Sequence, residues 1–144
     1  MFEGQYNHTI DTKGRLSIPP KFRDELGSTF HVTRGTDGCL FAYDDKNWEA
    51  FEKSLMSLPK LNEINLRNLR RIFIAGAASV EVDKQGRILI PAALRECAGL
   101  EKDVVVAGVG DCVEIWSKER WDALDLNPES EEVAETMARL GITM

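Results

Sequence analysis

The chain contains one stretch twice, first as Asp11-Thr12-Lys13-Gly14-Arg15-Leu16-Ser17-Ile18-Pro19 and again, 72 residues later, as Asp83-Lys84-Gln85-Gly86-Arg87-Ile88-Leu89-Ile90-Pro91. Over residues 11–27 and 83–99, seven of seventeen positions are identical, whereas chance would give about one. The chain therefore has a true internal repeat, and we expect each copy to fold into the same supersecondary unit.

Each copy has the pattern of a β-hairpin with a basic loop. The glycine of the loop, Gly14 or Gly86, is placed to take a positive φ, which other residues disfavour. The aspartate at the start of the loop can accept backbone N–H bonds and fix the turn, so we assign this structural role to Asp11 and Asp83. An arginine follows each glycine, so both loops carry a cation at a defined position.

A short helix and two further strands are expected after each hairpin. A proline with a preset φ opens the helix, and Gly27 or Gly99 is placed just past its end as a left-handed cap. The expected strands are 6–10, 15–18, 30–33 and 39–43 in the first copy and 78–82, 87–90, 104–107 and 112–116 in the second, with helices at 20–26 and 92–98.

Two helices are expected between the copies and one after them. Trp48, Phe51, Leu55 and Leu58 recur on one face, which is typical of an amphipathic helix. The next helix carries apolar residues from 64 to 73, and the last is expected at 128–140. The residues assigned to helix ends are Asp44, Pro59, Asn62, Gly76, Ser117, Asn127 and Gly141.

One copy of about 45 residues is too small to bury a stable core alone. We therefore expect the two copies to share one core about a pseudo-two-fold axis, with both loops on the same side. The expected organisation is a first repeat at 5–47, bridging helices at 48–75, a second repeat at 76–119 and a helical C-terminal tail at 120–144.

The composition is that of an ordinary globular protein, with 43% hydrophobic and 29% charged residues. No apolar run is long enough for a membrane helix, and the N-terminus lacks a signal pattern, so we expect a cytoplasmic protein with no membrane partner. The three cysteines contain no C-x-x-C pair. Cys39 and Cys112 occupy matching places in the copies and are expected to be small buried side chains.

No enzyme signature is present. His8 and His31 have no nucleophile motif beside them, and they are expected to be satisfied strand residues. Gly108-Val109-Gly110 lacks the third glycine and the helix of a dinucleotide fingerprint, and no cluster has metal-ligand spacing. The sequence thus predicts no catalytic site, no metal, no cofactor and no small-molecule substrate.

The net charge of −6 argues against a nucleic-acid partner, but the acidic residues are unevenly placed. Residues 12–23 contain four cations and no acid, and residues 84–95 contain three cations and no acid. A third acid-free window, residues 64–80, holds three arginines. Because fields are screened beyond roughly 8 Å at physiological salt, local basic patches on an acidic protein can still bind a polyanion.

The paired basic loops predict DNA recognition, because a two-stranded β-ribbon fits the major groove. The guanidinium forks of Arg15 and Arg87 are suited to guanine O6 and N7, at about 1–3 kcal/mol of discrimination each. The lysines are suited to phosphates, which set position rather than sequence. The predicted DNA-binding residues are Lys13, Arg15, Lys21, Arg23, Lys84, Arg87 and Arg95.

Structural roles are the alternative for these cations. A salt bridge to Asp11 is the simpler role for Arg15, and it is compatible with base recognition because the aspartate then orients the fork. Arg23 and Arg95, on the short helices, have the alternative of pairing with Asp24 and Glu96. For the three arginines of the third acid-free window, we favour a solvated or subunit-facing helix over DNA contact.

These motifs resemble the MraZ family, with its paired SpoVT/AbrB-type domains. The resemblance rests on Asp11-x-Lys13-Gly14-Arg15-Leu16, on Asp83-x-x-Gly86-Arg87, and on the opening Met1-Phe2-x-Gly4, and it covers nearly the whole chain. It implies a β-rich α+β fold, a double-split (swapped-hairpin) β-barrel of two AbrB-like repeats. It also implies ring-shaped homo-oligomers and cytoplasmic, nucleoid-associated binding to repeated DNA sites upstream of the division and cell-wall gene cluster. The second loop departs from the first by having Gln85 in place of a lysine.

Three or four cations per copy give one subunit only modest, salt-sensitive DNA binding. Several linked subunits gain effective concentration, and a head-to-tail ring presents the same loops in one orientation. The sequence therefore predicts a transcriptional regulator that prefers direct repeats in double-stranded DNA. The alternatives are a protein-assembly scaffold, with the hairpins as structural turns, and an AbrB-fold antitoxin-like module that binds a partner through its C-terminal helix.

Overall fold

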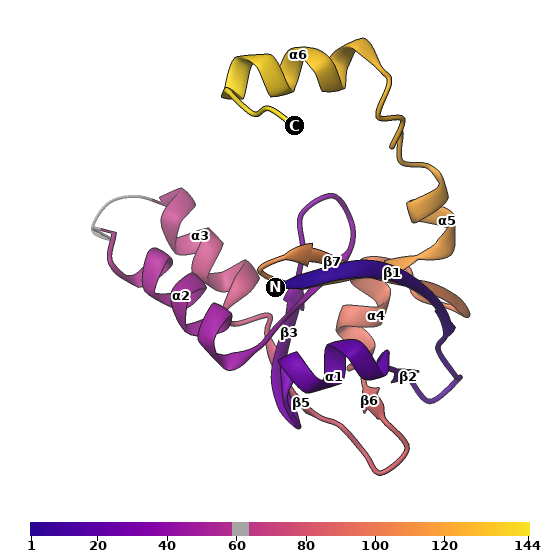
Figure 1. Cartoon of the computed structure of the whole chain (residues 1–144). Coiled ribbons are helices and arrows are strands. Elements are labelled where there is room, and N and C mark those ends of the chain that lie inside the picture. The colour runs from indigo at the N-terminus through magenta and orange to yellow at the C-terminus, as the bar shows by residue number, and fades with distance from the viewer. Residues whose placement is uncertain (59–63) are drawn as a thin grey trace.

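In a computed structural model, which describes residues 1–58 and 64–144, the chain forms a strand-rich α+β structure (Figure 1). The short helices of both copies have the predicted ranges, and most strands agree with the prediction to within one residue. The first strand, however, begins at Phe2 rather than at residue 6, and the strand predicted at 104–107 runs from Asp103 to Gly110. The elements are β1 (Phe2–Thr9), β2 (Arg15–Ser17), α1 (Pro20–Leu26), β3 (Thr29–Arg34), β4 (Leu40–Tyr43), α2 (Asp45–Met56), α3 (Ile64–Phe73), β5 (Ala78–Glu81), β6 (Arg87–Leu89), α4 (Ala92–Ala98), β7 (Asp103–Gly110), β8 (Val113–Ser117), α5 (Lys118–Asp122) and α6 (Glu131–Leu140).

The two copies are interleaved in one antiparallel arrangement. A six-stranded sheet has the order β1-β7-β8-β4-β3-β5, and a separate two-stranded ribbon joins β2 to β6. β1 pairs with β7 and β5 pairs with β3, which is the same relation with the copies exchanged. β4 with β8 and β2 with β6 also pair across the copies, as a pseudo-two-fold relation requires.

The predicted hairpin within each copy does not form as a ladder of its own. In the first copy, the strands flanking the loop meet only at an isolated bridge between Ile10 and Leu16. The second strand of each hairpin instead takes its partner from the other copy. This exchange lets both copies bury their apolar faces in one core, which neither is large enough to build alone.

The shared core fills the space between the sheet, the ribbon and the two short helices. Phe22 of α1 is fully buried and makes edge-on aromatic contacts with Phe2 and Tyr6 of β1. Leu16 and Ile88, at the centre of the ribbon, are buried in the same cluster. The ribbon is therefore held to the core by its inward face.

The helix ends differ from the predictions in several places. Ser117 caps α5 as predicted, by accepting a hydrogen bond from the Arg120 N–H. The Asp44 carboxylate makes no cap bond and instead accepts one from Asn47 Nδ2. The last helix begins after Ser130, whose hydroxyl accepts from the Val133 N–H.

Other predicted ends were right, differ in conformation or cannot be judged. Gly99 takes the predicted left-handed conformation after α4, with φ 65° and ψ 31°, and Gly141 does so after α6. Gly27 has φ 87° but ψ 178°, so it takes a positive-φ conformation that is open to glycine but differs from the predicted left-handed helical cap. The predicted roles of Pro59 and Asn62 lie outside the described residues.

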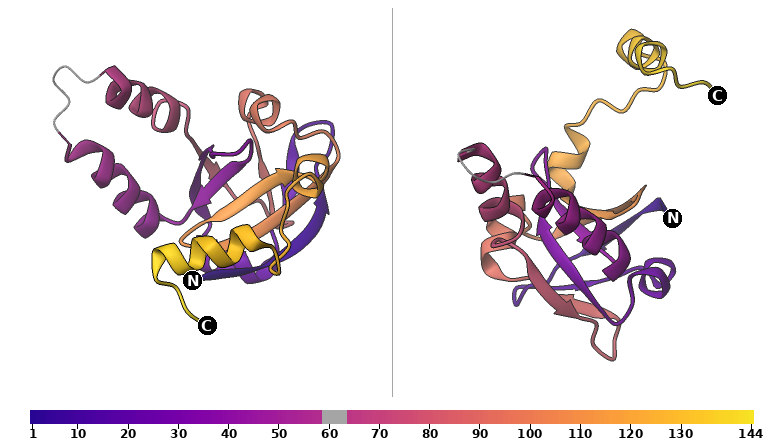
Figure 2. Two further views of the ribbon diagram at one scale, coloured as in Figure 1. Left: turned by 90° about the horizontal axis from the view of Figure 1, so that it is seen from above. Right: turned by 90° about the vertical axis from the view of Figure 1, so that its left-hand side faces the viewer.

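The helices α2 and α3 pack as a pair on one side of the sheet, whereas α6 stands apart from it (Figures 1 and 2). Aromatic rings join α2 to the sheet, with Trp48 stacked on His31 at 4.7 Å between ring centroids. Among the described residues, the hydrogen bonds of α6 and its flanks join only residues 125–142 to one another. No helix in the described part of the chain is long and apolar enough to cross a membrane.

Cys39 and Cys112 are buried, as predicted, while Cys97 is half-buried. All three are free thiols. Burial raises the pKa of the Cys39 and Cys112 thiols to about 12, so both are protonated at neutral pH and chemically quiet.

Candidate nucleic-acid interface

The first basic loop is organised by Asp11. Its Oδ1 accepts hydrogen bonds from the backbone N–H groups of Lys13 at 3.0 Å and Arg15 at 2.9 Å. Its Oδ2 lies 2.6 Å from Arg15 Nε in an ion pair. Gly14 completes the turn with φ 90° and donates its N–H to the Asp11 carbonyl. One carboxylate therefore fixes both the loop backbone and the direction of the arginine.

The second loop repeats this geometry. Asp83 Oδ1 accepts from the N–H groups of Gln85 at 2.8 Å and Arg87 at 2.9 Å, and Oδ2 lies 3.1 Å from Arg87 Nε. Gly86 has φ 78°. The same bonds thus form in both copies around different loop side chains, which shows that the aspartate and the glycine define the turn.

The ion pairs leave the ends of the guanidinium groups available. Within the described residues, the hydrogen bond from each fork to its aspartate uses Nε and neither Nη atom. The Arg15 side chain is 37% exposed and that of Arg87 is 27% exposed. Each partly exposed arginine therefore keeps two Nη groups that make no hydrogen bond among the described residues, and a bidentate contact to a base edge needs such a pair of donors.

The ribbon register brings the two arginines onto one surface. Arg15 pairs with Leu89, and Arg87 pairs with Ser17, with Leu16 opposite Ile88 between them. Because side chains alternate along a strand and the central pair is buried, the two outer pairs share the outward face. The arginines are diagonal neighbours, for which a separation of about 7–8 Å is typical. We call these four residues, Arg15, Ser17, Arg87 and Leu89, the outward face of the ribbon.

The two loops are locked to each other across the ribbon. The Ile18 N–H donates to the Gly86 carbonyl and the Ile90 N–H donates to the Gly14 carbonyl, each at 2.9 Å. The loops therefore lie at the same end of the molecule, opposite α6 (Figure 1). This disposition meets the expectation that both basic tips point to one side.

Arg23 and Arg95, predicted to touch DNA, each pack on the loop of the other copy. A Cβ added at Gly14 would lie 2.8 Å from the Arg95 guanidinium, and one added at Gly86 would collide with that of Arg23. Arg95 Nε donates to the Ile90 carbonyl at 3.0 Å, whereas Arg23 Nε is buried with no hydrogen-bond partner among the described residues. The expected alternative partners, Asp24 and Glu96, form no ion pair with them within the described chain.

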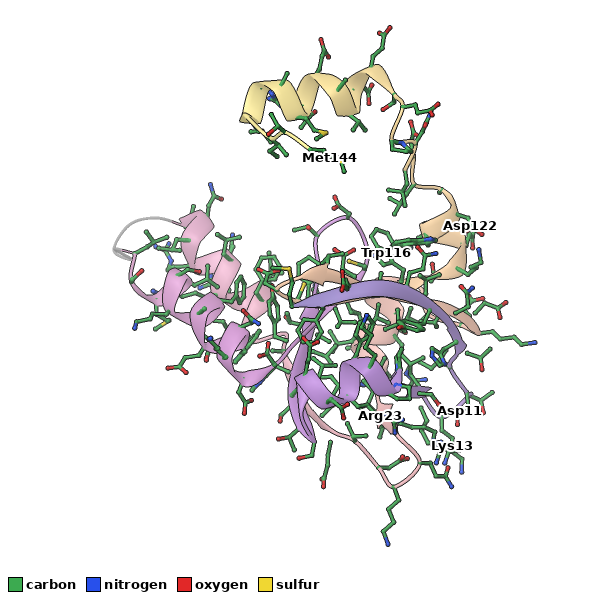
Figure 3. All side chains as sticks on the ribbon, in the orientation of Figure 1. Asp11, Lys13, Arg23, Trp116, Asp122 and Met144 are labelled. Atoms are coloured by element: carbon green, nitrogen blue, oxygen red, sulfur yellow. The ribbon has the colours of Figure 1, made fainter. Side chains whose placement is uncertain are left out.

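The predicted lysines surround this end of the molecule. Lys13 and Lys84 are exposed on the two loops, and Lys21 is exposed on α1. Figure 3 shows Lys13 beside Asp11 at the first loop, with Arg23 to their left, toward α1. Their contact with DNA remains a prediction, as does that of the arginines. Sequence reasoning assigned no role to Ser17 and Leu89, although the period of two along a strand places them on the arginine face.

The arginines of the third acid-free window lie on or near a different surface. Arg70 Nη2 donates to the Leu55 carbonyl of α2 at 3.2 Å, and Arg71 Nη1 donates to Asn68 Oδ1 at 2.9 Å. They belong to α3, which lies far from the loops (Figure 1). Among the described residues, no group of three or more His, Cys, Asp or Glu side chains is placed to hold a metal ion.

The loop carboxylates make stability depend on pH at the acid end. The Arg15 N–H is the largest cause that lowers the pKa of Asp11 below its usual 3.8, and the Arg87 N–H does the same for Asp83. A lowered pKa in the folded state adds stability that is complete above the unfolded pKa, near 4, and is lost as pH falls through the folded pKa. We therefore expect the urea concentration at the unfolding midpoint to decrease as the pH is lowered from about 5 to about 2.

The matched variant for this prediction is Asp11→Asn with Asp83→Asn. It keeps an acceptor oxygen for the backbone N–H groups but removes the titrating charge. Its urea midpoint should depend less on pH over the same range than that of the unchanged protein. Equal pH dependence of the two proteins would show that other carboxylates are responsible.

Comparison with known proteins agrees with the resemblance. The family model described as "MraZ protein, putative antitoxin-like" matches residues 1–70 and 73–140. A protein of Acetivibrio thermocellus named "Transcriptional regulator MraZ" is 54% identical over 144 residues, covering 99% of this chain and 100% of its own. One of the same name from Lachnoclostridium phytofermentans is 52% identical over 143 residues, covering 99% of each chain. The chain, with its interleaved repeats and paired basic loops, therefore belongs to the MraZ family.

Proposed function

We propose that this protein is a sequence-specific DNA-binding transcriptional regulator, and that the β2–β6 ribbon enters the major groove. The observation that supports this most is the outward face of the ribbon, where two oriented arginines keep Nη donors that make no hydrogen bond with the described residues. A two-stranded ribbon fits the major groove, and an arginine fork matches O6 and N7 of guanine. The names of the relatives, transcriptional regulators, point the same way.

The remaining cations are proposed to position the ribbon rather than to read bases. Lys13, Lys21 and Lys84 are exposed around it and are suited to phosphate contacts. Arg23 and Arg95 lie against the loops of the other copy, so their proposed contribution is mainly to hold the loops and to add positive potential. The field of such a patch is local, since screening limits it to roughly 8 Å.

We further propose that the sheet and the ribbon together form the swapped-hairpin barrel expected of two AbrB-like repeats. The pairing of each second hairpin strand with the other copy supports this. The consequence for function is rigidity, because the loops are fixed by strands that both copies contribute.

We propose that several protein subunits assemble, with α6 of one subunit against α3 of the next. Met137 lies on one face of α6 with Leu140, which is 62% exposed. The α6 helix carries three glutamates and one arginine, whereas α3 carries three arginines and no acid, so the two surfaces are complementary in charge. Exposed apolar residues of α3 (Ile64, Leu69 and Ile72) would meet the apolar face of α6.

A closed head-to-tail ring of such subunits presents every ribbon in the same orientation. It would therefore bind direct repeats in double-stranded DNA, and we propose that these sites lie upstream of a division and cell-wall gene cluster, as the family resemblance implies. Such a regulator acts in the cytoplasm, at the nucleoid.

The test measures binding to a duplex selected from a random pool, carrying one site, two direct sites or two inverted sites about 10 base pairs apart. We expect the direct pair to bind at least about tenfold more tightly than one site, because linked binding raises the effective concentration. The affinity should also fall steeply with salt, since the lysine contacts release counterions. Failure to bind any selected duplex would refute the proposed function.

The assembly is tested in the same assay with Met137→Asp and Leu140→Asp in the full chain. These changes place charge on the apolar face of α6 and should reduce both the oligomer size and the gain from direct repeats. The control is Ala138→Asp, which adds charge elsewhere on the same helix and should change neither. An unchanged oligomer in the double variant would show that α6 is not the contact.

A further inference from the structure

The outward face of the ribbon is not symmetric between the copies. The two arginines correspond, but the position that is Ser17 in the first copy is Leu89 in the second. Leu89 is 59% exposed, although Leu16 and Ile88, the central pair of the same ribbon, are buried. An exposed leucine in itself is common. Leu89, however, lies directly opposite Arg15 on the proposed recognition surface, so a base bound by Arg15 would bring its neighbour close to this leucine.

We propose that Leu89 contacts the C5-methyl group of a thymine that neighbours the guanine bound by Arg15, so that the ribbon recognises DNA in one direction only. This inference rests on the proposed function and names the base chemistry that the same site would select. Apolar side chains recognise thymine through that methyl group, which is the apolar group that the bases present in the major groove.

The spacing of the ribbon fits adjacent bases. Directly opposed residues on a strand pair have Cβ atoms about 4.5–5.5 Å apart, and successive bases rise by about 3.4 Å along a strand. Arg15 and Leu89 are therefore suited to neighbouring base pairs. Arg87 lies diagonally across at about twice that rise, beside the hydroxyl of Ser17, which is tolerant of either a donor or an acceptor.

The asymmetry gives the ribbon a direction. If both copies carried the same residue at this position, the outward face would be the same in both DNA orientations, and only the loops, which carry Lys13 in one copy and Gln85 in the other, would distinguish them. With Leu89 beside Arg15 and Ser17 beside Arg87, only one orientation brings the apolar side chain to a thymine. A directional subunit is what a preference for direct repeats requires.

The test replaces each thymine of a selected duplex by deoxyuridine, one at a time, which removes only the methyl group. For the unchanged protein we expect one thymine per site at which this weakens binding about four-fold, the value of burying one methyl-sized group. Leu89→Ala should weaken binding to the thymine duplex by a similar factor and make the protein indifferent to the methyl group at that position.

The matched control is Leu126→Ala, since Leu126 is equally exposed, at 60%, but lies beyond α5 and away from the ribbon. It should keep the deoxyuridine profile of the unchanged protein. A second variant, Ser17→Leu with Leu89→Ser, exchanges the two residues while preserving composition. It should move the methyl-sensitive thymine to the other side of the guanines.

The outcomes separate this inference from the proposed function. Tight, salt-sensitive binding of the unchanged protein without any methyl-sensitive thymine would overturn the inference and leave the function standing. A methyl-sensitive thymine that persists in Leu89→Ala would overturn it too, by assigning the contact to another residue. Absence of binding to every selected duplex would overturn both.

Discussion

Replacing Arg15 and Arg87 together with alanine is expected to abolish sequence-specific DNA binding while leaving the fold unchanged. Each bidentate contact contributes about 1–3 kcal/mol of discrimination, so losing both should reduce specific affinity about 30-fold at least and up to about 10⁴-fold. The fold should persist because both side chains lie on the outward face of the ribbon, and their ion pairs with Asp11 and Asp83 are partly exposed to solvent. Fluorescence anisotropy with a labelled duplex would measure the affinity.

Two further proteins make this result specific. Lys46→Ala with Lys118→Ala removes the same charge from α2 and α5, away from the ribbon and from α6, and should bind almost normally. Arg15→Lys with Arg87→Lys keeps the charge but loses the planar fork, so it should retain non-specific binding and lose sequence preference. If the alanine double variant kept its specificity, the ribbon would not be the recognition surface.

Gly86→Ala is expected to damage both stability and DNA binding severely. The residue has φ 78°, and a Cβ there would collide with the Arg23 guanidinium that packs on the loop. The positive φ alone costs an alanine about 1–2 kcal/mol, and displacing a packed side chain adds roughly 1–3 kcal/mol. The second loop would move, Arg87 would lose its orientation, and specific affinity should fall more than tenfold, a loss that corresponds to about 1.4 kcal/mol.

The chain provides a close control for this substitution. Gly110 has φ 103°, yet nothing lies within 4 Å of a Cβ added to it. Gly110→Ala should therefore show the conformational cost alone and leave DNA binding intact. Urea unfolding of both variants measures the difference, which reports the packing of Arg23 on the loop. Equal destabilisation of the two variants would contradict that packing.

Local chemistry made the strands and short helices predictable. The Asp-x-x-Gly-Arg pattern specifies its own turn, since one carboxylate can reach the backbone N–H groups two and four residues on. Ser117 was recognised as a cap for the same reason, because the bond spans three residues. The prediction at Asn127 failed where several capping residues stand close together, because local sequence cannot choose between competing caps. Asp44 does occupy the N-cap position of α2, but its carboxylate accepts a bond from Asn47 rather than from a backbone N–H.

The strand partners were not readable from local sequence in the same way. A hairpin loop suggests that its own flanking strands form the ladder, yet β2 pairs with β6, about half a chain away. That choice is made by burial, since the exchange covers the apolar faces of both copies at once. The packing of Arg23 and Arg95 on opposite loops follows from the exchange, so sequence reasoning that treated each copy separately could not find it.

The sequence by itself determined the repeat, the shape of each loop and the identity of its cation, because these depend on residues within reach of one another along the chain. Only the tertiary structure decided that Arg15 lies opposite Leu89 and Arg87 opposite Ser17. That register joins segments separated by about 70 residues, and it is set by packing Leu16 and Ile88 into a common core. Residues close together in the sequence thus determine which side chains the proposed recognition surface carries, whereas packing of the shared core determines how those side chains are arranged.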